Sequence, residues 1–227
     1  MEQHQTYFWL CKTKKPLLSS LLVMPASQQN GHDFDEEIKN IHAVGKTSYT
    51  AKHDIPAECN GDVPLSVKSS VGDTCDSGDA LRMYDNAELS CYQVLRGQFE
   101  QVGGQKHLRA LHLVDMSNST ALLFGGNTRN DLVALDTLTK SYRHGREDIR
   151  RAVHAMKNTL NARSGYMQFR PKMDSQQHRL QCSIPKWSAF VAEHTERVLY
   201  HSTAGIYRGV QLTLVRDSLR RIRQARY

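Results

Sequence analysis

One phosphate-binding pattern is partly present near the N-terminus. Gly45-Lys46-Thr47 matches the last positions of a nucleotide-binding loop, but Asn40 stands where that loop requires a glycine. The sequence also contains no nucleophile elbow, dinucleotide-binding glycine turn or paired acidic motif. These patterns predict no catalytic residue, no cofactor and no enzymatic activity. An enzyme whose active residues converge only in the folded chain stays open as an alternative.

Histidine and cysteine are the other residue types that could do chemistry, as metal ligands. The chain has 11 His and 5 Cys, and its closest pairs are His107 with His112 and His178 with Cys182. Neither pair has a second pair nearby, so no metal site is predicted. The cysteines are odd in number and include no CxxC pair. This pattern favours a reducing, intracellular compartment over secretion.

Positive charge is concentrated late in the chain. Residues 1–85 carry 8 Lys+Arg against 12 Asp+Glu, whereas residues 140–227 carry 18 against 6. Such an excess predicts attraction to nucleic acid, acidic lipid or an acidic protein, and the planar guanidinium suits phosphate. The alternative is a solvated charged face. The predicted polyanion-binding residues are Arg143, Arg146, Arg150, Arg151, Lys157, Arg216, Arg220, Arg221, Arg223 and Arg226.

The N-terminal segment 1–25 combines aromatic and basic residues. Aromatic rings can enter a membrane interface while lysines meet anionic headgroups. The equal alternative is that these residues dock on the protein's own core. The predicted membrane-contact residues are Phe8, Trp9, Lys12, Lys14 and Lys15.

The sequence predicts a single compact α+β domain over 81–227, with a small antiparallel sheet packed by amphipathic helices. Residues 26–80 are rich in Ser, Gly, Asp and Asn and are predicted to be a disordered acidic linker. The clearest element is an amphipathic helix over 146–162. Strands are predicted over 108–114, 121–124, 179–184 and 206–215, and over 88–99, where a helix fits nearly as well. A strand or helix is predicted over 190–199 and a short basic helix over 217–227.

The stretch AGIYRGVQLTL over 204–214 resembles the late strand of rhabdovirus matrix proteins, which carries a glycine, an aliphatic residue, Tyr, a basic residue and Gly. The preceding amphipathic helix over 148–160 looks like the long helix of that family. The length and the basic balance also agree. The chain departs from the family in lacking a PPxY motif, and Tyr7-Phe8-Trp9-Leu10 satisfies only a loose YxxL pattern.

This resemblance implies a structural virion protein without a reaction. It would condense ribonucleoprotein or RNA through basic surfaces, self-associate into a homo-oligomer and attach to the inner face of an anionic envelope membrane. Its location would be the cytoplasm or nucleus of the host and the inner face of the virion membrane. The alternative function is non-specific nucleic-acid binding without a membrane role.

Overall fold

The computed structural model describes residues 26–45, 53–173 and 178–217, and side chains from residue 31 onward. The helices are α1 (Ala26–Ile41), η1 (Ala57–Cys59), α2 (Ala80–Ala87), α3 (Thr120–Phe124), α4 (Arg129–Ser141), α5 (Glu147–Ala162), α6 (Trp187–Glu193) and η2 (Thr195–Arg197). The strands are β1 (Leu65–Val71), β2 (Cys75–Asp79), β3 (Gln93–Val102), β4 (Gln105–Asp115), β5 (Gln168–Lys172), β6 (Arg179–Ile184), β7 (Val198–Ser202), β8 (Ile206–Tyr207), β9 (Val210–Gln211) and β10 (Val215–Asp217).

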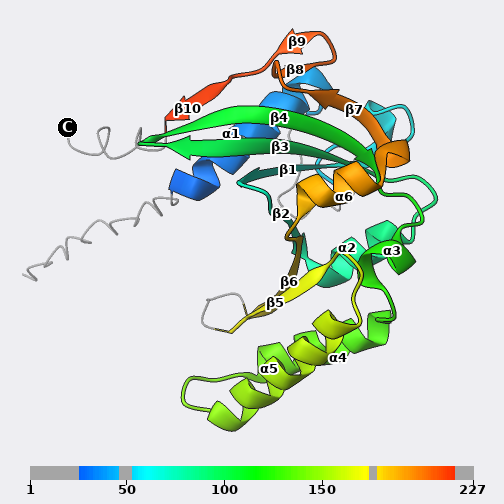
Figure 1. Ribbon diagram of the computed structural model, residues 1–227, viewed down its shortest axis with the longest axis vertical. Coiled ribbons are helices and arrows are strands. Elements are labelled where there is room, and N and C mark those ends of the chain that lie inside the picture. The colour runs from blue at the N-terminus through cyan, green and yellow to red at the C-terminus, as the bar shows by residue number, and fades with distance from the viewer. Residues whose placement is uncertain (1–25, 46–52, 174–177, 218–227) are drawn as a thin grey trace, which may run out of the picture.

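The larger sheet has five strands and is mixed. β1 runs parallel to β3, and β3 forms a long antiparallel hairpin with β4 through Gly103-Gly104. The other edge of β4 is shared, because β10 pairs with its beginning and β7 with its end (Figure 1). The β8–β9 hairpin connects β7 to β10. Arg208 and Gly209 form its two-residue turn, and both have the positive φ angles (48° and 77°) of a tight hairpin turn.

Each face of the larger sheet has its own apolar core. On one face, Phe34 and Ile38 of α1 pack against Leu95 and Phe99 of β3. On the other face, a larger core gathers residues of α2 to α6, β2, β5 and β6, with Trp187 fully buried in it. The sheet therefore separates a small core beneath α1 from the main core of the molecule.

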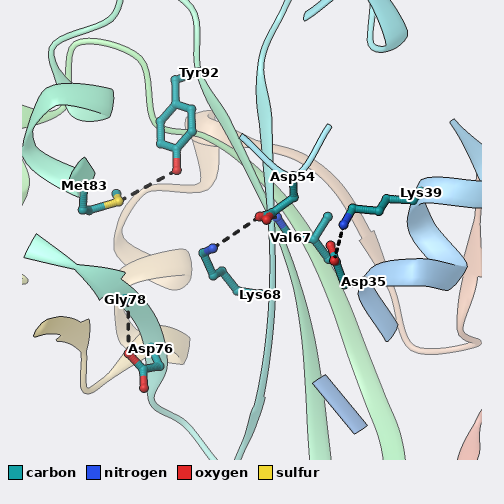
Figure 2. Close-up of polar contacts among 9 residues, drawn as sticks. All are labelled: Asp35, Lys39, Asp54, Val67, Lys68, Asp76, Gly78, Met83 and Tyr92. Atoms are coloured by element: carbon teal, nitrogen blue, oxygen red, sulfur yellow. Dashed lines mark hydrogen bonds and ion pairs between the residues drawn. The ribbon is translucent and has the colours of Figure 1, made fainter. Parts of the chain in front are cut away.

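An aspartate covers the outer edge of β1. Asp54 accepts a hydrogen bond from the backbone N–H of Val67 at 2.7 Å, and its carboxylate lies 3.4 Å from Nζ of Lys68 (Figure 2). Ile55 also forms a β-bridge with Leu65. These contacts satisfy a strand edge that would otherwise expose unpaired backbone groups.

The antiparallel three-stranded sheet β2–β6–β5 extends from beneath β1 toward α4 and α5, which lie farthest from the β8–β9 hairpin (Figure 1). Thr128 and Asp131 form a capping box that starts α4. Glu147 and Asp148 occupy the first turn of α5, where the helix dipole favours acidic side chains.

The α+β class and the single domain are confirmed. The predicted helix over 146–162 is α5, and the strands predicted over 108–114 and 179–184 are β4 and β6. The strand predicted over 88–99 begins only at Gln93, and the 190–199 segment contains the end of α6, η2 and the start of β7. Residues 121–124 are wrong as a strand because they belong to α3, and 206–215 is divided among β8, β9 and β10. The helix predicted over 217–227 lies outside the described residues beyond Asp217.

The disordered linker predicted over 26–80 is wrong for residues 26–45 and 53–80. These residues form α1, η1, β1 and β2, and they belong to the same sheets as the rest of the chain. Several of their apolar side chains, including Phe34, Ile38 and Leu65, are completely buried. Order here depends on pairing with distant strands, which local composition does not reveal.

Candidate polyanion interface

The described part of the molecule is divided into a basic and an acidic region. Residues 128–173 and 178–184, the basic lobe, contain eleven Lys+Arg and four Asp+Glu, a net charge of +7. Residues 26–45, 53–127 and 185–217, the sheet body, contain ten Lys+Arg and seventeen Asp+Glu, a net charge of −7. The basic lobe comprises α4, α5, β5 and β6, at the end of the molecule opposite the β8–β9 hairpin (Figure 1).

Two of the predicted contact residues are already neutralised by neighbouring carboxylates. Arg146 donates two hydrogen bonds to Asp148, at 3.0 and 2.7 Å, and Arg150 lies 3.7 Å from the Glu147 carboxylate. Hydrogen bonds from Arg146 and from the backbone lower the pKa of Asp148 to about 2. Arg146 and Arg150 therefore contribute less to an attractive surface than their sequence positions suggest.

Three predicted contact residues keep an uncompensated charge. Arg143 and Arg151 are exposed, Lys157 is half-buried, and none of them forms an ion pair with a described residue. Arg143 also donates hydrogen bonds to the carbonyls of Lys140 and Tyr142, each at 2.8 Å, and so stabilises the end of α4. Arg151 and Lys157 on α5, with Arg143 in the connection before it, form one part of the candidate interface.

Sequence reasoning missed three further cations, which lie on the β5–β6 hairpin. Lys172 lies directly opposite Arg179 in the antiparallel register, and Arg170 lies two residues away on the same face. Arg170 and Lys172 are exposed, Arg179 is half-buried, and none has an ion-pair partner among the described residues. The alternation of polar and apolar residues over 168–172 could have indicated this strand, because Phe169 is buried between exposed neighbours.

Arg216, predicted as a polyanion contact, does not lie on an exposed basic surface. It is 8% exposed, forms an ion pair with Glu37 of α1 and lies 5.8 Å from the ring centre of Phe34. Its guanidinium is therefore part of the internal contact between β10 and α1. Arg216 is therefore not part of the candidate interface, and its prediction as a polyanion contact is wrong.

The remaining predicted contacts lie outside the described residues. These are Arg220, Arg221, Arg223 and Arg226 at the C-terminus and Phe8, Trp9, Lys12, Lys14 and Lys15 at the N-terminus. Within the described ranges, no helix is long and apolar enough to cross a membrane. The same ranges contain no group of three or more His, Cys, Asp or Glu arranged to hold a metal ion. Comparison with protein families, curated proteins and solved structures finds no match to this chain.

Proposed function

We propose that this chain is a matrix-like structural protein that binds the phosphate backbone of RNA or ribonucleoprotein through the basic lobe. One observation carries the proposal: six cations without an ion-pair partner among the described residues lie on α5, the connection before it and the β5–β6 hairpin. Because like charges on neighbouring strands repel, the Lys172–Arg179 pair gains stability from a bound anion. These six residues are Arg143, Arg151, Lys157, Arg170, Lys172 and Arg179.

The lobe contacts phosphate and not bases. Tyr142 and Phe169 are buried in the core, and Tyr166 donates its hydroxyl hydrogen to Glu193. The described surface of the lobe thus offers no aromatic platform on which bases could stack. Binding that depends on charge alone is independent of sequence and weakens steeply with salt.

A second contact, with an anionic membrane, completes the proposed matrix-like role. The β8–β10 region exposes Ile206, Val210, Leu214 and Val215, each between 39% and 45% accessible, at the end opposite the basic lobe. Exposed aliphatic side chains can enter the lipid interface. Because the sheet body is itself acidic, the attraction to anionic headgroups in this proposal comes from the predicted N-terminal cations Lys12, Lys14 and Lys15.

Self-association is the third part of the proposal. A molecule with a basic lobe of +7 and a sheet body of −7 can attract the opposite region of a second copy. Such contacts are electrostatic, so raising the salt concentration should dissociate them. Sedimentation velocity at two salt concentrations measures this directly, and an oligomer that is indifferent to salt contradicts it.

Binding to a single-stranded RNA across a salt series tests the phosphate contact. Engaging six phosphates gives a slope of log K against log salt of about −4. The triple variants R143Q/R151Q/K157Q and R170Q/K172Q/R179Q should each reduce that slope by about 2. The matched control R82Q/R109Q/K186Q removes the same charge from exposed positions of the sheet body. An equal effect from the control would show that net charge, and not the basic lobe, drives binding.

Vesicle flotation tests the membrane contact. Vesicles with and without anionic lipid should recover the protein only when anionic lipid is present, and Val210→Asp should reduce recovery. Val71→Asp is the control, because Val71 is equally exposed at 45% but lies on β1. RNA binding without any flotation at low salt would favour the alternative function, a nucleic-acid-binding protein with no membrane role.

A further inference from the structure

Four basic residues form one row across the larger sheet. The strand registers pair Lys68 of β1 with Arg96 of β3, Arg96 with His112 of β4, and His112 with His201 of β7. Lys68 is compensated by Asp54 (Figure 2). The other three residues of the row form no ion pair with a described residue.

Arg96 already places a full positive charge inside this row. It is completely buried, and its guanidinium donates hydrogen bonds to Ser70, Gln98 and the carbonyls of Gly72 and Thr74. Its charged group also lies 5.5 Å from the ring centre of Trp187. Burial lowers the pKa of Arg96, yet a guanidinium with these four acceptors stays protonated.

His112 lies beside that charge and has no compensating partner. Its ring stacks on His201 with centres 4.7 Å apart and meets the edge of Trp187 at 6.4 Å. The residue is 9% exposed, and its Nδ1 forms no hydrogen bond within the described chain. Burial, followed by the nearby His201 and Arg96, lowers the pKa of His112 to about 4.

The groups that act on His112 come from each element around it. Arg96 of β3 and His201 of β7 oppose protonation, whereas Asp73, in the loop between β1 and β2, favours it. Asp73 is already engaged, because its carboxylate accepts hydrogen bonds from the backbone and hydroxyl of Ser188. The element α6 contributes Trp187, which is uncharged.

The strand that pairs with β4 beside His112 is β7. It pairs with β4 only over Leu111–Val114, with an irregularity in the register, and its five residues are half-buried or exposed. Just before it, Arg197 donates hydrogen bonds to the carbonyls of Asp115 and Ser117, at 3.2 and 3.1 Å, whereas Trp187 and Phe190 of α6 are fully buried in the main core. Residues 198–202 can therefore separate from β4 while α6 and the β3–β4 hairpin stay in place.

We propose that His112 is an acid-sensitive latch: its protonation places a second charge between Arg96 and His201 and releases residues 198–202 from β4. The open form exposes the paired edge of β4, and water solvates the imidazolium. This proposal is independent of the proposed polyanion binding.

The sign and size of the effect follow from linkage. His112 has a lowered pKa in the closed form, so the open form binds more protons as the pH falls from about 6.5 to about 4. Closure is fully favoured above this window and weakened below it. A difference of about 2.5 pKa units increases the ratio of open to closed molecules by up to roughly 300-fold.

Hydrogen exchange of the full-length protein tests the latch. Protection factors, corrected for the intrinsic exchange rate, are compared at pH 7 and pH 4.5 for residues 198–202 and for the β3–β4 hairpin. The wild type should lose protection at residues 198–202 while the hairpin keeps it. His112→Phe keeps a buried ring that cannot be protonated and should abolish the loss. His201→Gln should reduce it only in part, since burial is the larger cause.

His154→Gln on the exposed face of α5 is the matched control and should behave as the wild type. Two results would overturn the proposal. The first is no selective loss of protection in the wild type. The second is an unchanged loss in His112→Phe, which would show that acid opening does not depend on His112.

Discussion

Arg216 of β10 forms an ion pair with Glu37 of α1, which precedes it by 179 residues. Glu37 also accepts hydrogen bonds from the backbone and hydroxyl of Thr213, at 2.8 and 3.0 Å. One carboxylate thus fixes the last described strand to the first described helix. Contacts of Glu37 thus join the two ends of the described chain within the sheet body.

Replacing Glu37 with Gln should therefore destabilise the whole domain. The change leaves the guanidinium of Arg216 buried without a counterion, at a cost of about 2–4 kcal/mol. Denaturant unfolding measures the loss. Glu36→Gln is the control on the same helix, since Glu36 is 53% exposed and lies 3.8 Å from Lys39. Equal stability of the two variants would contradict the importance of the Arg216 pair.

Gly97 should not tolerate a side chain. A Cβ at this position would lie 2.7 Å from Cζ of Phe34, which is fully buried under α1. We expect Gly97→Ala to cost about 1–3 kcal/mol through overpacking. Phe34→Leu should recover part of that loss in the double variant. Simple additivity of the two costs in denaturant unfolding would show that the ring and the methyl group do not collide.

Lys172→Glu should increase stability while weakening RNA binding. It replaces a like-charge cross-strand pair with an opposite-charge pair against Arg179, worth about 0.2–1 kcal/mol. The melting temperature and RNA affinity are measured on the same protein. Lys157→Glu is the control. Lys157 lies on α5 and is not paired with a cation across two strands, so this change should lower the RNA affinity without raising the melting temperature. A destabilised Lys172→Glu variant would argue against repulsion in the unbound protein.

Thiol labelling at pH 8 should distinguish the cysteines. Burial raises the pKa of Cys75 to about 11 and holds that of Cys182 well above its usual value, so neither forms a reactive thiolate in the folded protein. Cys91 is exposed and should react first. In a Cys11→Ser background, Cys91→Ser should remove the fast phase. Labelling of Cys75 or Cys182 faster than unfolding would contradict their burial.

The elements that the sequence predicts well are those whose pattern is local. α5 carries acidic residues in its first turn and buries Val153 and Leu160 on one stripe, so its periodicity alone identifies it. The same local pattern gave a wrong prediction for residues 121–124. Their apolar run suits a strand, but they form a short helix, and the φ of 57° at Gly125 prevents the helix from continuing.

The candidate interface was predictable only in part, because charge along a sequence does not say which way a side chain points. Arg216 lies between exposed Val215 and exposed Asp217, yet it is the one that faces inward. Its inward position depends on the register with β4 and on Glu37 in α1. Lys172 and Arg179 are seven positions apart, and only the hairpin register places them opposite each other.

The division of charge between the basic lobe and the sheet body also limits how a polyanion can be coated. Once phosphate covers the lobe, each bound molecule turns its acidic side outward, and a further strand of nucleic acid meets a repulsive layer. A bound molecule should therefore not join two strands of nucleic acid by itself, although its acidic side can still attract the basic lobe of another copy. The coated filaments would repel one another until a positively charged surface, or the basic lobe of another copy, bridges them.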